Sequence, residues 1–166
     1  LELGDCIIEE NLLLNLSDNS INVLINLIDN IQINENDITI EMYNLVGVIH
    51  HCRGNLDSAK KYYLLAIENK NEKALYNLGC LYDSDCLYIS VDDHKSACEI
   101  VLAKKYYLLA IEKGIYQSIK KLAHIYRREG NTELAKKYYL LDIEKGNSKS
   151  INILARIYER EGNIEL

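Results

Sequence analysis

The heptapeptide AKKYYLL occupies residues 59–65, 103–109 and 135–141 of this 166-residue chain. The second and third copies begin 32 residues apart, and the sequence between them has the length of one helical hairpin. Recurrence at such a spacing is typical of proteins in which each unit is too small to bury its apolar face alone and packs on its neighbours. We therefore predict a stack of repeated hairpins.

Apolar residues within one unit recur with a helical period. Ile119, Leu122, Ala123 and Tyr126 share one stripe, and the next segment places its alanine and tyrosines on a second stripe, with the lysines turned toward water. Gly130 lies between the two segments, where a residue with positive φ commonly ends a helix. These patterns predict two antiparallel helices joined by a tight turn.

Composition supports long helices in a folded chain. Apolar residues make up 48% of the sequence, and proline, phenylalanine and tryptophan are absent. The net charge of −6 argues against general attraction to nucleic acid or anionic membranes. Five cysteines without a C-x-x-C pair, and no long apolar run, predict an intracellular, cytoplasmic protein without a membrane span. The chain starts at Leu1, so we expect a processed chain or part of a longer one.

The predicted organisation has two parts. Residues 1–40 are expected to form a divergent N-terminal helical hairpin that caps the array. Residues 41–166 are expected to hold about 3.5 repeats, with an insertion at 83–102, since the first two heptapeptides are 44 rather than 32 residues apart. The last repeat would lack its second helix and expose Leu154, Ile157 and Tyr158, which would allow self-association through the C-terminal repeat.

Several positions form a framework that resembles the tetratricopeptide and Sel-one-like repeat superfamily. In that pattern a small residue follows leucine, an aromatic comes three positions later, and the next helix carries alanine and an aromatic. The framework positions are Leu78, Gly79, Tyr82, Ala103, Tyr107, Leu122, Ala123, Tyr126, Ala135 and Tyr139. The resemblance implies an all-α, right-handed α-solenoid that acts as a non-enzymatic scaffold or adaptor. The 32-residue spacing and the missing proline depart from the family pattern.

Residues suited to catalysis or metal binding do not form a convincing site. His50, His51 and Cys52 are the one dense cluster, but adjacent helical residues point about 100° apart. His50 also occupies a framework aromatic position, so we interpret it as a residue at the edge of the core. We predict no catalytic residue, metal or cofactor. Asp142 replaces Ala66 and Ala110 on a packed face, and such a carboxylate should find a cation or mark incomplete packing.

The first helices are expected to line the concave side of the solenoid, where their variable residues would meet a partner. The C-terminal half of this face is basic, which predicts an acidic or phosphorylated peptide as the ligand. The predicted partner-binding residues are Tyr76, Lys120, His124, Arg127, Arg128, Lys149, Asn152, Arg156 and Arg160. A solvated face with pairs such as Glu129 with Lys136 is the plainer interpretation. The alternatives in function are a helical-repeat RNA binder, which the net charge disfavours, and a regulatory subunit of an enzyme outside this sequence.

Overall fold

The computed structural model describes Val23, residues 40–83 and residues 97–162. The chain forms two compact units, Leu1–His94 and Lys95–Leu166. The boundary falls inside the predicted second repeat, so its two helices belong to different units. The predicted N-terminal hairpin lies outside the described residues, apart from Val23 and Ile40, and so does most of the predicted insertion.

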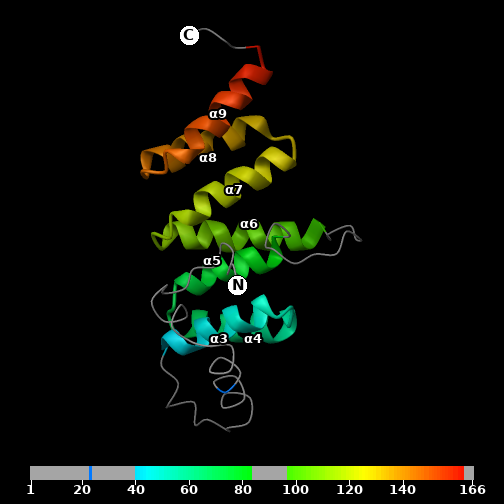
Figure 1. Cartoon of the computed structure of the whole chain (residues 1–166), viewed down its shortest axis with the longest axis vertical. Helices are drawn as coiled ribbons and strands as arrows, with labels where there is room; N and C mark the ends of the chain where they lie inside the picture. The colour runs from blue at the N-terminus through cyan, green and yellow to red at the C-terminus, as the bar shows by residue number, and fades with distance from the viewer. Residues whose placement is uncertain (1–22, 24–39, 84–96, 163–166) are drawn as a thin grey trace. The chain divides into compact units, whose positions relative to one another are not determined.

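The first unit contains α3 (Ile40–Cys52), α4 (Leu56–Glu68) and α5 (Lys73–Tyr82). Helix α4 packs against both α3 and α5 (Figure 1). The helices α3 and α4 approach closely because position 47 has no side chain. A Cβ atom built on Gly47 would lie 2.5 Å from Cδ1 of Tyr63, too near for any larger residue.

The second unit contains α6 (Ala97–Glu112), α7 (Gln117–Arg128), α8 (Thr132–Glu144) and α9 (Lys149–Arg160), each packed on the next (Figure 1). Gly130 closes α7 with a φ of +75°, and the side chain of Asn131 accepts a hydrogen bond from the backbone N–H of Leu134 at 3.2 Å. Hairpins packed in succession, without strands among the described residues, confirm the predicted class, an all-α helical repeat solenoid. Its right-handed sense stays a prediction.

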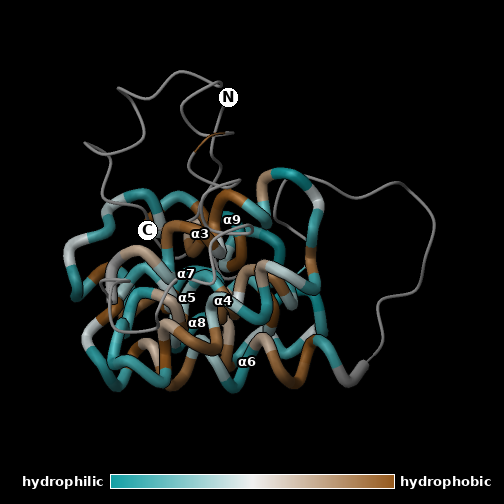
Figure 2. The backbone as a smooth tube through the Cα atoms, turned by 90° about the horizontal axis from the view of Figure 1, so that it is seen from below, coloured by the Kyte–Doolittle hydropathy of each residue, from teal (hydrophilic) through white to brown (hydrophobic). Residues whose placement is uncertain are grey.

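The repeated heptapeptide supplies the core of every hairpin. Its alanine and second tyrosine are fully buried in all three copies, as Ala59 with Tyr63, Ala103 with Tyr107, and Ala135 with Tyr139. Hydrophobic and hydrophilic residues alternate along the helices with the helical period, so one side of each helix faces the interior (Figure 2). The first tyrosine of the pair is half-buried and stacks on the preceding helix. The rings of Tyr126 and Tyr138 lie 5.4 Å apart, and those of His50 and Tyr62 also lie 5.4 Å apart.

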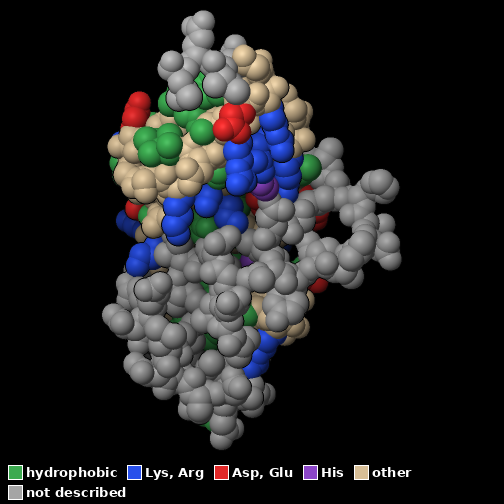
Figure 3. Space-filling view, turned by 45° about the horizontal axis from the view of Figure 1, so that its top comes forward, with side chains coloured by type: hydrophobic (Ala, Val, Ile, Leu, Met, Phe, Trp, Pro, Cys, Tyr) green, Lys and Arg blue, Asp and Glu red, His purple; other side chains and the backbone are tan. Residues whose placement is uncertain are grey.

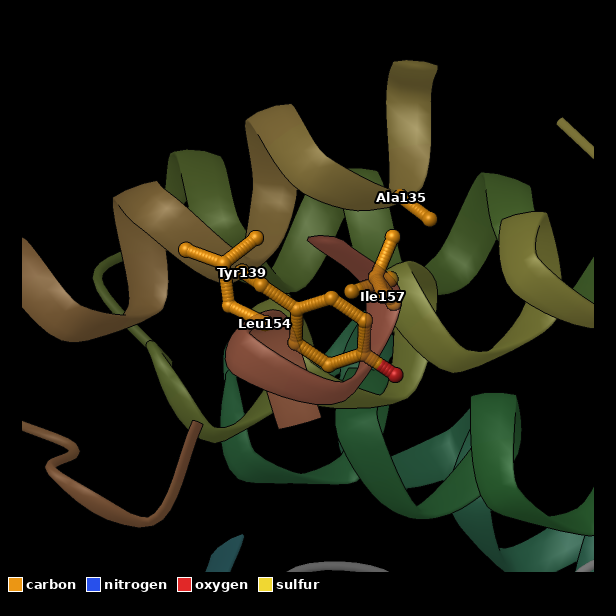
Figure 4. Close-up of a cluster of buried hydrophobic side chains, with 5 residues drawn as sticks. Ala135, Tyr139, Leu154 and Ile157 are labelled. Atoms are coloured by element: carbon orange, nitrogen blue, oxygen red, sulfur yellow. The ribbon is translucent and has the colours of Figure 1, made fainter. Parts of the chain in front are cut away.

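Two expectations about the later repeats were wrong. Helix α6 begins at Ala97, so residues 97–102 extend the second helix of the repeat rather than belonging to an insertion. Leu154 and Ile157 are each only 7% exposed, because Ala135 and Tyr139 of α8 cover them (Figure 4). Of the three residues expected to lie bare, only Tyr158 is exposed, at 36%.

Candidate partner-binding surface

The first lysine of each heptapeptide contacts the next helix in the chain. The Nζ atom of Lys60 lies 5.5 Å from the ring centroid of Tyr82, and that of Lys104 lies 5.4 Å from the centroid of Tyr126. The third copy repeats the contact between Lys136 and Tyr158 at 5.2 Å. These are cation–π contacts between successive hairpins. The expectation that all these lysines simply face water was therefore wrong.

Acidic residues complete this contact in the second unit. The ammonium group of Lys104 pairs with Glu129 at 2.7 Å, and that of Lys136 pairs with Glu161 at 2.6 Å and with Glu133 at 3.0 Å. Hydrogen bonds to Glu161 and Glu133 raise the pKa of Lys136 above its ordinary value. The suggested pair between Glu129 and Lys136 is wrong, because each residue has another partner. We call each lysine with its tyrosine and glutamate an inter-repeat clamp.

The clamps leave the arginines of α7 and α9 without a neighbouring acid. Within the described parts of the chain, Arg127, Arg156 and Arg160 form no ion pair, and all three are exposed. Figure 3 shows lysine and arginine side chains gathered on one face of the second unit, with a histidine among them. We define the basic face by its residues on α7 and α9: Lys120, His124, Arg127, Arg128, Lys149, Asn152, Arg156 and Arg160.

The members of the basic face differ in how accessible they are. Arg128, Lys149 and Asn152 are exposed, like the three arginines above, whereas Lys120 and His124 are half-buried. Lys120 also lies near Asp142, since its charge lowers the pKa of that carboxyl. The exposed arginines are therefore the members best placed to meet a ligand.

Tyr76 does not share this surface. It is 3% exposed and lies in the first unit, among buried residues of α5 that include Cys80. The prediction that Tyr76 contacts a partner was wrong, because the side chain is inside the protein. Asn44 and Val48, at corresponding positions of α3, are buried as well. The variable positions of the first helices are thus accessible in the second unit and interior in the first.

Asp142 is buried but well accommodated. Its carboxylate accepts hydrogen bonds from the hydroxyl of Ser150 and from Nδ2 of Asn147, the latter at 2.9 Å. Burial raises the pKa of Asp142, and the hydrogen bonds and Lys120 partly oppose that rise. The suggestion that this aspartate marks incomplete packing was wrong, because it is only 2% exposed and joins α8 to the start of α9.

The histidine cluster of α3 has a packing role. The ring of His50 stacks on that of Tyr62, and Nδ1 of His51 lies 3.2 Å from the hydroxyl of Tyr63. Burial lowers the pKa of His51 and raises the pKa of the Cys52 thiol, which disfavours the charged form of each. The described residues hold no group of three or more His, Cys, Asp or Glu side chains that could bind a metal ion.

Sequence reasoning overlooked the clamps, although the sequence carries a signal for them. Each clamp lysine precedes its tyrosine by 22 residues, and Lys104 and Lys136 precede their glutamates by 25 residues. A search for charged pairs at the repeat spacing, rather than within one helix, would have found them.

Comparison with known proteins agrees with this geometry. The tetratricopeptide repeat family model matches residues 40–73, which span α3, α4 and the start of α5, and residues 120–141, in α7 and α8. Among curated proteins, none matches the sequence. None of the helices in the described ranges is long and apolar enough to cross a membrane. From the matched segments and the succession of packed hairpins, the chain belongs to the tetratricopeptide repeat superfamily.

Proposed function

We propose that this chain is a protein–protein interaction module and that the basic face of α7 and α9 binds an acidic segment of a partner protein. Tetratricopeptide repeats generally mediate contacts between proteins and typically act as non-enzymatic scaffolds. The observation that carries the finer proposal is the exposure of Arg127, Arg156 and Arg160 without an ion pair among the described residues. A partner carboxylate or phosphate would supply the missing counter-charge.

The clamps explain why these arginines are available in a chain of net negative charge. Glu129 directly follows the arginine pair at the end of α7, yet its carboxylate bonds to Lys104 of the preceding helix. Glu161 follows Arg160 and bonds to Lys136 in the same way. The nearest acids are therefore engaged elsewhere, and the guanidinium groups remain open to bidentate hydrogen bonds from a ligand.

A plainer role exists for two of these side chains. Arg128 and Arg160 lie in the last turn of their helices, where a cation interacts favourably with the helix dipole. That role does not extend to Arg156, which lies in the middle of α9. Arg156 and Arg127 are therefore the residues whose charge is best explained by a ligand.

Affinity capture from cell lysate tests the proposal. The variant carrying Arg127→Glu and Arg156→Glu should lose the captured partner while keeping its helical circular dichroism. A matched control carries Lys70→Glu and Lys137→Glu, two exposed residues away from the basic face, and has the same change in net charge. The control should capture the partner as the unchanged protein does.

Two results would contradict the proposal. Equal capture by the arginine variant and the unchanged protein would show that the basic face is not the binding surface. Loss of capture after ribonuclease treatment would favour the RNA-binding alternative, because the arginines would then meet a nucleic-acid backbone.

A further inference from the structure

Helices α7 and α9 carry the same residues at corresponding positions, but their surroundings differ on one side. Ile119 of α7 is fully buried, whereas Ile151 of α9 is 50% exposed. Ala123 is fully buried, whereas Ala155 is exposed. In α7 this side packs on α8, the second helix of the same hairpin. We call Ile151, Ala155 and Tyr158 the α9 stripe.

The aromatic contacts show what the α9 stripe lacks. Tyr126 contacts Lys104 at 5.4 Å and also stacks on Tyr138, at 5.4 Å between ring centroids. Tyr158 has the lysine contact, with Lys136 at 5.2 Å, but no second ring within the described part of the chain. We propose that the α9 stripe binds an amphipathic helix of a partner protein, docked as α8 docks on α7.

The packing between α7 and α8 defines the chemistry of this helix. The residue against Ala155 must be small, as Ala135 is in the buried cluster with Ala123. An aromatic three residues later would stack on Tyr158, as Tyr138 stacks on Tyr126. The stripe also continues the existing interface, because Leu154 and Ile157 of the same helix are already buried against α8.

Glu159 adds a polar requirement. It occupies the position that His51 has in α3, and His51 lies 3.2 Å from the hydroxyl of Tyr63 in the facing helix. In α7 the corresponding residue is Arg127, whose charge lowers the pKa of Tyr139. A carboxylate at this position is complementary to a hydroxyl donor on the docked helix. The occupant is therefore a helix with a small residue followed three and four residues later by tyrosines.

A peptide copy of α4 provides the probe, since residues 56–68 have this pattern. Short helices are marginal in water, so a lactam between the exposed side chains of Asp57 and Lys61 should hold the peptide helical. Fluorescence anisotropy of the labelled peptide would measure its affinity for the protein. Ala155→Arg should weaken binding at least tenfold by blocking the stripe. Leu140→Arg, which adds the same charge at an exposed position of α8, should leave the affinity unchanged.

Three results would overturn the proposal: no binding to the unchanged protein, equal binding to the Ala155→Arg variant, or dimerisation of the unchanged protein that Ala155→Arg abolishes while peptide binding is absent. The last result would assign the stripe to a second copy of this chain, and sedimentation velocity would detect it. The proposal is independent of the basic face, because the Arg127→Glu and Arg156→Glu variant should still bind the peptide.

Discussion

The α6–α7 junction and the α8–α9 junction use the same inter-repeat clamp but differ beneath it. Lys104 and Lys136 each contact a tyrosine and a glutamate of the following helix at nearly equal distances. Below the clamp, the first junction places Ala110 near Ser118, whose buried hydroxyl has no hydrogen-bond partner among the described residues. The second places Asp142 there, and Ser150 donates to it.

The comparison separates what holds repeats together from what distinguishes them. The clamp and the buried alanine and tyrosine recur, so they define the repeat itself. The buried carboxylate, the α9 stripe and the arginines belong to single copies. Differences between copies are therefore where a specific function is most readily encoded.

The largest expected effect comes from truncating one isoleucine in each first helix. Ile119→Ala should lower the free energy of unfolding by about 2–5 kcal/mol, because the fully buried side chain leaves a cavity. Ile151→Ala should cost less than about 1 kcal/mol, since half of that side chain already faces water. Chemical denaturation monitored by circular dichroism would measure both. Equal losses would show that another element covers the α9 stripe.

A smaller effect is expected from the buried carboxylate and should depend on pH. Because the pKa of Asp142 is raised in the folded state, its protonated form favours folding. Its contribution is present below the unfolded pKa, near the ordinary value of 3.8, and is lost as pH rises through the folded pKa.

Asp142→Asn removes this titration and keeps an oxygen that can accept from Ser150. The variant should therefore gain stability relative to the unchanged protein as pH rises from about 3.5 to 7. Urea unfolding at several pH values measures the difference. A gap between the two proteins that stays constant with pH would contradict the raised pKa.

The smallest effect should come from the clamps. Lys104→Met and Lys136→Met keep most of the aliphatic stem but remove the charge, so each should lower Tm by about 2–5 °C at low salt. Screening should shrink the loss in 1 M sodium chloride. Thermal unfolding at the two salt concentrations tests this, and a loss that does not change with salt would indicate that the stem packing matters rather than the charge.

Much of the fold follows from local sequence patterns. The heptapeptide, the helical stripes and Gly130 predict the hairpins, because a short turn between amphipathic helices permits little else. Exposure of Arg127 and Arg156 follows from the same periodicity. The burial of Leu154 and Ile157 was not predicted, since the expectation considered only a missing second helix and not the cover that the preceding one provides.

Other features depend on contacts between repeats and were missed for that reason. Lys136 looks solvated within its own helix, and only the neighbouring helix supplies Tyr158 and Glu161. Tyr76 was assigned to the surface because it aligns with Lys120, yet the same position is interior in the first unit. Alignment of repeats predicts the register of a residue but not how deeply its neighbours cover it.

The central claim is that the exposed arginines of α7 and α9 bind an acidic partner. Once capture has identified a partner, isothermal titration calorimetry with its acidic segment should show at least tenfold weaker binding to the Arg127→Glu and Arg156→Glu variant. The Lys70→Glu and Lys137→Glu control should bind as the unchanged protein does. Equal affinities for the arginine variant and the control would contradict the claim.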